Sequence, residues 1–332
     1  MPTGTPNSEG SGRALRYGAA RVLFAVGLVV GVASVLGLAG RIWWVFDLLS
    51  HPRMQYAVIL AVVAGALALT RRGFAPLAFL ALALVNGAAV GQLFLATPTN
   101  GDSTAGREIT VVSFNVQIGN PGRPEVIDWV NDLDADVVFL WETSQPWRDD
   151  FAAATLPFNQ SQPLQVGSTI GGLVLTRESA QVRLLDTGAR SSIEVRLPFG
   201  DGEIVIIGAH PFPPISASRA ADRDEHLSAV ARYAATIDGP VIVTGDLNAT
   251  PWSSAFRPLG DVLVNSMDGF GWQATYPAGT GLLMMPIDHL LHNEHLTTVA
   301  RSVGPDLGSD HLPLTVTLAP AAAADLTGAA DR

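Results

Sequence analysis

The chain has 332 residues, of which 48% are hydrophobic and only 15% charged, and its formal net charge is −10. So much apolar residue can build a core, which excludes a chain that is disordered over most of its length. The sequence contains no cysteine, which excludes disulfide frameworks, thiolate-bound zinc, iron–sulfur clusters and thiol catalysis.

The charge is divided unevenly along the chain. Residues 1–98 contain seven arginines and two acids, whereas residues 99–332 contain 13 arginines and 28 acids. A basic, apolar front is therefore joined to a strongly acidic body. Such a body repels the phosphates of nucleic acid unless metal ions or a local patch of arginines intervene.

The front contains three charge-free apolar runs, which are 22–40, 54–70 and 73–97. A helix needs about 20 apolar residues, with a range of roughly 17–25, to cross the hydrocarbon core of a bilayer. We therefore expect a three-helix transmembrane segment at 22–97, preceded by an N-terminal tail at 1–21. The chain is then a multi-pass protein of the cell membrane.

The arginines of the front predict its orientation. Three of them precede the first run, and Arg71 and Arg72 fill the short loop between the second and third runs. The positive-inside rule places the N-terminal tail and this loop in the cytoplasm. With three spans, the acidic body then lies outside the cytoplasm.

The body alternates β-rich runs with helical patterns. A polar linker at 98–107 leads into a domain at 108–318, and the Ala- and Pro-rich tail at 319–332 is expected to be disordered. Helical spacing predicts helices at 125–133 and 219–237. Buried apolar runs predict strands at 109–116, 137–141, 172–176, 193–197, 204–208, 241–244, 287–291 and 314–318. This α/β pattern places functional sites at strand ends.

Polar residues gather at those strand ends. Each alone is compatible with an ordinary turn, because Asn and Asp commonly form turns after strands. Their joint occurrence is more specific. The candidates are Asn115, Glu142, His210, Asp246, Asn248, Asp288, Asp310 and His311.

These segments resemble the endonuclease/exonuclease/phosphatase superfamily, also called deoxyribonuclease-I-like. The resemblance spans about 109–318, and the apolar front resembles the membrane-anchored bacterial branch. It implies an α/β four-layer sandwich, in which two packed mixed β-sheets are flanked by helices and preceded by three transmembrane helices. The matching segments are Val-Ser-Phe-Asn at 112–115, Ala-Asp-Val-Val-Phe-Leu-Trp-Glu at 135–142, Ala-His-Pro at 209–211, Gly-Asp-Leu-Asn at 245–248, Ile-Asp-His at 287–289 and Ser-Asp-His at 309–311.

The resemblance also implies metal-binding roles. Glu142 matches the metal-binding carboxylate, supported by Asn115, and Asp310 matches a second carboxylate near the metal. Oxygen ligands without thiolates suit a hard cation, so we expect Mg²⁺ first and Mn²⁺ second. The ion would neutralise charge on a phosphate.

The remaining residues match catalytic positions of the same family. Asp288 and His311 resemble its Asp–His pair, in which His311 acts either as general base on the attacking water or as a cation that clamps the phosphate. Asp246 is the competing candidate for orienting that water. Asn248 and His210 resemble donors to the non-bridging phosphate oxygens.

The function predicted from these residues is a membrane-anchored, metal-dependent phosphoesterase that cleaves a phosphodiester or phosphomonoester. The acidic balance and the membrane helices favour a lipid head group or a small phosphoester as substrate. One alternative is an endo- or exonuclease of the same fold, which would need a local basic groove. The other is a non-catalytic, membrane-attached binding domain. The sequence indicates no protein partner.

Overall fold

The computed structural model describes residues 8–69, 73–95, 106–160 and 171–321. The Arg71–Arg72 loop, most of the linker expected at 98–107 and most of the tail expected at 319–332 lie outside these residues. The chain divides into two compact units, Met1–Val90 and Gly91–Arg332.

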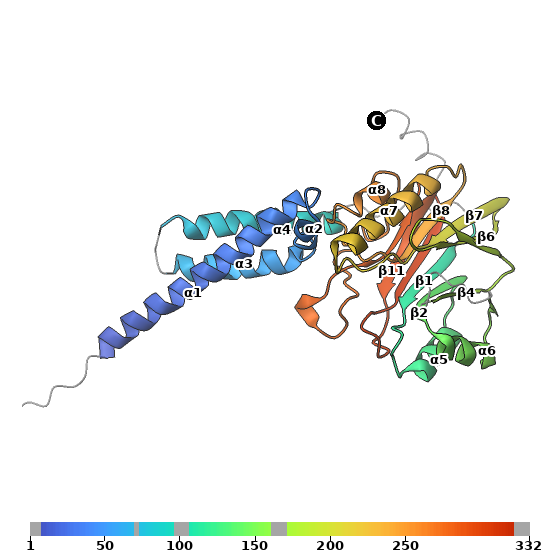
Figure 1. The fold of residues 1–332 in the computed structure, drawn as a ribbon, viewed down its shortest axis with the longest axis horizontal. Helices are drawn as coiled ribbons and strands as arrows, with labels where there is room; N and C mark the ends of the chain where they lie inside the picture. The colour runs from blue at the N-terminus through green and yellow to red at the C-terminus, as the bar shows by residue number, and fades with distance from the viewer. Residues whose placement is uncertain (1–7, 70–72, 96–105, 161–170, 322–332) are drawn as a thin grey trace, which may run out of the picture. The chain divides into compact units, whose positions relative to one another are not determined.

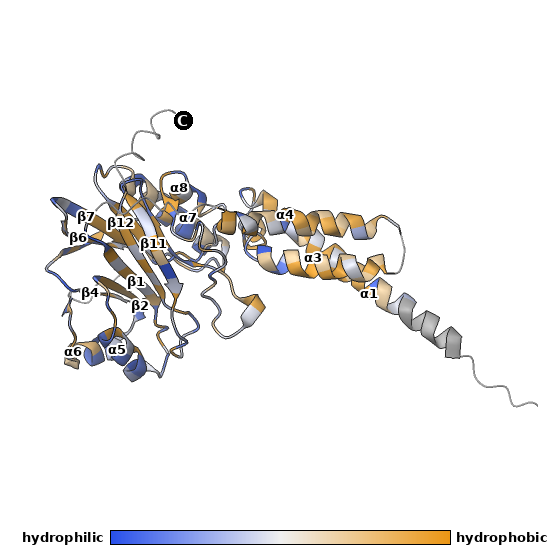
Figure 2. Ribbon diagram, turned by 180° about the vertical axis from the view of Figure 1, so that it is seen from behind, coloured by the Kyte–Doolittle hydropathy of each residue, from blue (hydrophilic) through white to orange (hydrophobic). Residues whose placement is uncertain are grey.

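Helices build the front of the chain. They are α1 (Ser8–Leu36), η1 (Gly37–Ala39), α2 (Trp44–Leu48), α3 (Arg53–Ala68) and α4 (Ala75–Leu95). In Figure 2, where the ribbon is coloured by hydropathy, hydrophobic residues dominate the coloured parts of α1, α3 and α4. Among the described residues, two stretches, Tyr17–Ala39 and Ala75–Leu95, are long and apolar enough to cross a membrane.

The expectation of three transmembrane helices is wrong by this criterion, because the run at 54–70 forms only the 16-residue helix α3. At 1.5 Å per residue, 16 residues span about 24 Å, less than the ~30 Å hydrocarbon core. The helix begins directly after Pro52, which cannot donate an N–H to a preceding turn. A charge-free run describes only the composition of a segment, whereas the residues at which the helix begins and ends determine how far it can span.

A buried polar chain links the three front helices. Arg53 on α3 donates from Nη1 to the Asn86 side-chain oxygen at 3.1 Å. Asn86 on α4 in turn donates to the hydroxyl of Ser34 on α1 at 2.6 Å. All three residues are buried, so these hydrogen bonds replace water that the surroundings exclude.

Two six-stranded mixed sheets build the body. The first has the order β11 (Leu296–Val303), β12 (Leu314–Pro320), β1 (Ile109–Asn115), β2 (Val137–Thr143), β4 (Gly171–Thr176) and β3 (Asn159–Gln160). The second has the order β5 (Gln181–Leu185), β6 (Ser192–Phe199), β7 (Gly202–Gly208), β8 (Val241–Asp246), β10 (Asp288–His292) and β9 (Val264–Asn265).

The helices and the two sheets of the body form four layers (Figure 1), and apolar side chains fill the space between them. Between the sheets, Ile109, Val137 and Phe139 pack against Ile193 and Ile206. On the outer face of the first sheet lie α5 (Arg123–Asn131) and α6 (Gln145–Ala153), and on that of the second lie α7 (Ala217–Ala234) and the short α8 (Arg257–Gly260). The predicted four-layer sandwich of two mixed sheets flanked by helices is confirmed.

Strand direction then determines which strand ends meet. β1 and β2 are parallel, as are β7 and β8, so the C-terminal ends of each pair lie side by side. β10 and β12 run antiparallel to β8 and β1, so the N-terminal ends of β10 and β12 lie next to these C-terminal ends. Residues from six distant segments can therefore share one site.

Candidate active site

Asn115 connects carboxylates from the two sheets. Its amide nitrogen donates to Glu142 Oε1 and to Asp246 Oδ2, each at 3.1 Å. Its amide oxygen is occupied, because it accepts the backbone N–H of Gln117 at 3.0 Å. Asn115 is buried, so it fixes both carboxylates from a rigid position at the end of β1.

Glu142 owes its direction to a local irregularity in β2. Its φ is +60°, and the register between β2 and β4 shifts between Trp141 and Thr143. Such a bulge redirects one side chain of a strand, and non-glycine residues adopt a positive φ rarely and often at functional sites. The Glu142 carboxylate consequently stands beside Asn115 and keeps 24% of its side-chain surface exposed.

The Gly-Asp-Leu-Asn segment holds Asp246 through tight packing. Gly245 has a φ of +148°, and a Cβ there would lie 1.9 Å from the carbonyl oxygen of Ala209. Asn248, with a φ of +50°, donates its backbone N–H to Asp246 Oδ1 at 3.0 Å and its amide to the carbonyl of Pro211 at 3.2 Å. Only glycine can occupy position 245 without displacing the β7–β8 pair.

Asp288 and His311 form the expected pair. The distance from His311 Nδ1 to Asp288 Oδ2 is 2.8 Å, and that from His311 Nε2 to Asp246 Oδ2 is 3.6 Å. Ser309 ties this loop to β1, since its hydroxyl donates to the carbonyl of Asn115 at 2.7 Å and accepts the N–H of His311 at 3.1 Å. Asp288 and His311 are both buried.

Burial and neighbouring charge perturb both groups. Burial disfavours the charged imidazole of His311, but the carboxylates of Asp288, Asp246 and Asp310 outweigh burial and raise its pKa to about 10. Burial, followed by the charge of Asp288, raises the pKa of Asp246 to about 7, against the opposing charge of His311. At neutral pH, His311 is therefore a cation.

His210 completes the cluster on the β7 side. Its Nε2 lies 3.6 Å from Asp246 Oδ2 and 3.9 Å from Glu142 Oε1, and its ring lies against Trp141. Burial, together with the positive charge of Arg190, holds the pKa of His210 well below its usual range. His210 is thus a neutral imidazole, in contrast to His311.

The structure places seven of the eight candidates in this connected cluster. Asp310 is the exception, since among the described residues no hydrogen bond or ion pair joins its carboxylate to Glu142 or Asn115. Its backbone oxygen accepts from Ala278 at 2.8 Å, and its charge acts on His311.

Two residues near the cluster were missed by sequence reasoning. The ring of Tyr276 lies 4.7 Å from that of His311, centroid to centroid. The guanidinium of Arg190 lies 3.5 Å from Nδ1 of His210. Both come from loops without a local motif, so only their position in the fold identifies them.

The donor set fits a hard divalent cation. Asp246 and Asp288 each offer a carboxylate oxygen within 4.8 Å of the other, and Glu142 shares the Asn115 amide with Asp246. Oδ1 of Asp288 is buried and has no hydrogen-bond partner among the described residues. Such crowded carboxylates, with no thiolate, suit Mg²⁺ or Mn²⁺, whose charge would offset the cost of burying Asp246.

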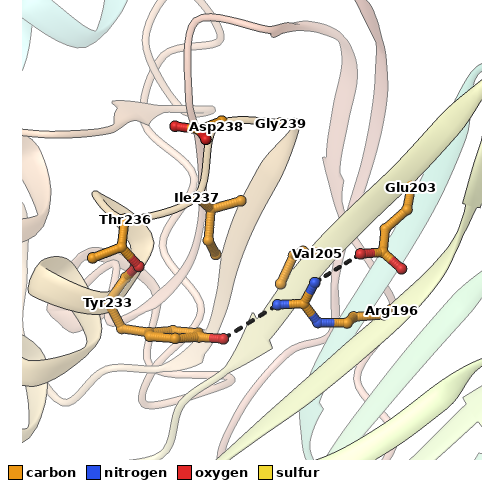
Figure 3. Close-up of a pocket in the computed structure, with 8 residues that line it drawn as sticks. All are labelled: Arg196, Glu203, Val205, Tyr233, Thr236, Ile237, Asp238 and Gly239. Atoms are coloured by element: carbon orange, nitrogen blue, oxygen red, sulfur yellow. Dashed lines mark hydrogen bonds and ion pairs between the residues drawn. The ribbon is translucent and has the colours of Figure 1, made fainter.

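A pocket of the body lies near the N-terminal ends of β7 and β8, away from the C-terminal ends that carry the candidate site. It is lined by Arg196, Glu203 and Tyr233, among others, and contains none of the candidate residues (Figure 3). Beside it, buried Glu194 accepts hydrogen bonds from Arg183, Arg196 and Tyr233. Its charge is satisfied within the protein, which is typical of a structural ion-pair network.

Comparison with solved structures agrees with the fold. The body is similar to D. rerio TDP2 carrying humanising mutations (TM-score 0.54, 15% identity, 64% of this chain and 98% of that one). It is also similar to an Enterococcus faecalis protein described as functionally unknown (TM-score 0.54, 16% identity, 64% and 100%) and to an endonuclease/exonuclease/phosphatase from Bacteroides vulgatus (TM-score 0.52, 15% identity, 64% and 99%).

Comparison by sequence identifies the family. No curated protein matches the chain. Residues 112–311 match the model of the Endonuclease/Exonuclease/phosphatase family, whose members hydrolyse phosphoesters. All eight candidate residues lie within this match. The match covers more than half of the chain, and the chain therefore belongs to the Endonuclease/Exonuclease/phosphatase family.

Proposed function

We propose that the chain is a divalent-metal-dependent phosphoesterase that cleaves its substrate by in-line attack of water. The observation that carries this proposal is the hydrogen-bonded convergence of Glu142, Asn115, Asp246, Asp288 and His311 from both sheets. A family of hydrolases with this fold supplies the reaction class.

Glu142 is the proposed principal metal ligand, and Asn115 fixes its orientation. Asp310 is the proposed second acidic residue, because its charge lies close enough to act on His311. When bound, the ion neutralises charge that develops on the phosphate. Carboxylate oxygens that are already positioned require little rearrangement to hold it.

Protonation separates the roles of Asp246 and His311. With a pKa near 10, His311 is an imidazolium at neutral pH and is suited to clamp a phosphate oxygen rather than to remove a proton. Asp246, with a pKa near 7, is suited to orient the attacking water and to accept its proton. Asn248 and neutral His210 are the proposed neutral donors to phosphate oxygens.

A substrate panel tests this proposal on the full-length chain in detergent micelles or lipid nanodiscs. The panel contains bis-nitrophenyl phosphate, nitrophenyl phosphate, phospholipids, single-stranded DNA and plasmid, each with Mg²⁺, with Mn²⁺ or with a chelator. We expect metal-dependent hydrolysis that His311→Ala abolishes. A folded protein that hydrolyses none of these substrates would instead support the binding-domain alternative.

The charge of the body favours a lipid head group or a small phosphoester over duplex DNA, because residues 99–332 carry 28 acids and 13 arginines. The nuclease alternative is motivated by one structural neighbour, D. rerio TDP2, which was solved with a single-stranded DNA product (TM-score 0.52, 15% identity). Cleavage of DNA in preference to lipid in the panel would favour that alternative.

We also propose attachment to a membrane through α1 and α4. The number of spans decides the side of the membrane on which the active site lies. Two spans return the body to the side of the N-terminus, and three would place it on the opposite side. Reporter fusions at residue 321, compared with fusions in the N-terminal tail, measure this sidedness directly.

A further inference from the structure

We propose that Arg190 and Arg219, gathered on the ring of Phe212, form a subsite for a second phosphate group of the substrate. The group would lie beside the phosphoester that is cleaved. This inference rests on the proposed phosphoesterase function and names a feature of its substrate. It makes Arg190 and Arg219 specificity-determining residues.

Both guanidinium groups lie on one aromatic ring. The Cζ atoms of Arg190 and Arg219 are 4.0 Å and 3.8 Å from the centroid of Phe212. Phe212 follows His210 by two residues in the loop after β7, and Arg219 lies on the first turn of α7. The side chains of Phe212 and Arg219 are half-buried, so the group is open to a ligand from solvent.

The imidazole ring of His210 lies between the proposed subsite and the catalytic cluster. Nη1 of Arg190 donates to the carbonyl of His210 at 3.1 Å and lies 3.5 Å from Nδ1 of its ring. The other edge of that ring, Nε2, faces Asp246 and Glu142. An anion held by Arg190 is therefore separated from the proposed metal site by the width of a single side chain.

The charges of the two arginines are not neutralised within the described parts of the body. Neither has a carboxylate within 4 Å there, whereas Arg183, Arg196 and Arg232 each have one. Nε of Arg190 is also buried without a hydrogen-bond partner among those residues. A buried cation without a counterion is costly, and two like charges on one ring repel each other. A phosphate dianion would remove both penalties.

The site electrostatics agree with this geometry. Burial lowers the pKa of Arg190, and the charge of Arg219 lowers it further, whereas Glu142 and Asp246 act in the opposite direction. Guanidinium groups bind phosphate through paired, charge-assisted hydrogen bonds, which are stronger than bonds between neutral groups. The chemistry at this position therefore matches a phosphate and not an apolar substituent.

The test compares two nitrophenyl phosphodiesters that are esters of the same alcohol. In one of them this alcohol carries an additional phosphate group, and in the other it does not. The full-length chain in detergent should favour the doubly phosphorylated substrate in kcat/KM. Arg219→Leu, which keeps an apolar contact with Phe212, should reduce that preference about tenfold, and Arg219→Lys should restore part of it. Arg232→Leu, on the exposed surface of the same helix, should leave the preference unchanged.

Binding of inorganic pyrophosphate to the metal-free protein provides a second readout that needs no turnover. Calorimetry should show binding that weakens about tenfold in Arg219→Leu and not in Arg232→Leu. Equal pyrophosphate affinity and equal substrate preference in wild type and Arg219→Leu would overturn the subsite. Arg219-dependent binding in a protein that hydrolyses no phosphoester would retain the subsite and refute the proposed function instead.

Discussion

The buried pair of Asp288 and His311 makes a prediction about stability that depends on pH. The Nδ1–Oδ2 distance is 2.8 Å, and burial leaves the carboxylate with no exposed surface. In Asp288→Asn the new amide oxygen can still accept the Nδ1 proton, so only charge assistance is lost, which costs about 1–2 kcal/mol. Asp288→Ala removes the hydrogen-bonded counterion of the imidazolium and leaves, among the described residues, only Asp246, at 3.6 Å, within ion-pair distance, which should cost about 3 kcal/mol.

The pH dependence follows from the direction of the shift. The pKa of His311 is raised from 6.5 to about 10 in the folded protein. The pair therefore contributes its full stability below pH 6.5 and loses it as the pH rises through 10. The stability lost in Asp288→Asn should be largest near pH 6 and should shrink steadily toward pH 10.

Chemical denaturation of the metal-free protein in detergent, followed by tryptophan fluorescence, measures this difference because Trp141 and Trp147 are buried in the body. Wild type and both variants are compared at pH 6, 8 and 10. A free-energy difference that stays constant over this range would refute the charged pair. A difference that grows with pH would show that His311 is neutral in the folded protein.

Three further predictions concern other residues of the site. Asp246→Asn should abolish hydrolysis yet stabilise the chelator-treated protein by about 1–2 kcal/mol at pH 8, as measured in thermal melts. The reason is that burial raises the pKa of Asp246 to about 7, so that its charged form is costly at pH 8. This gain in stability should fade as the pH falls below 7 and the Asp246 carboxyl becomes protonated in the wild type. Gly245→Ala should destabilise the body by about 3 kcal/mol, since its Cβ would meet the carbonyl oxygen of Ala209. Gly239→Ala should change denaturation midpoints little, because its Cβ would make only an ordinary contact, 3.8 Å from the carbonyl oxygen of Glu203. Tyr276→Ala should reduce kcat/KM by up to about tenfold through loss of the ring packed on His311, and Tyr276→Phe should retain nearly all of it.

The interior strands could be predicted from the sequence because both of their faces are buried. β1, β2, β7 and β8 consist mainly of buried, apolar residues, and polar site residues end or closely follow each of them. The four strands that prediction missed are β3, β5, β9 and β11, which are the four edge strands of the two sheets. Edge strands face solvent, so β5 carries Gln181 and Arg183 among its apolar residues and lacks the apolar run that identifies an interior strand.

The candidate site also contains residues that the sequence predicted and residues that it did not. Residues that end or begin interior strands carry a motif, and the family resemblance named them. Arg190 and Tyr276 reach the cluster from loops whose path depends on tertiary packing, so no local pattern marks them. The number of membrane-spanning helices was overestimated for a related reason, because the ends of α3 depend on Pro52 and on the helix geometry, and not on the length of the apolar run.

In the proposed function, Glu142 and its neighbours hold a divalent ion that phosphoester hydrolysis requires. The most direct test titrates Mg²⁺ into the full-length wild type and Glu142→Gln while recording hydrolysis of bis-nitrophenyl phosphate. We expect a saturable rise in rate for wild type, and a loss of at least about a hundredfold for the variant at the same Mg²⁺ concentration. Equal rates for the two proteins, or a wild-type rate that does not change when the metal is chelated, would contradict the proposed function.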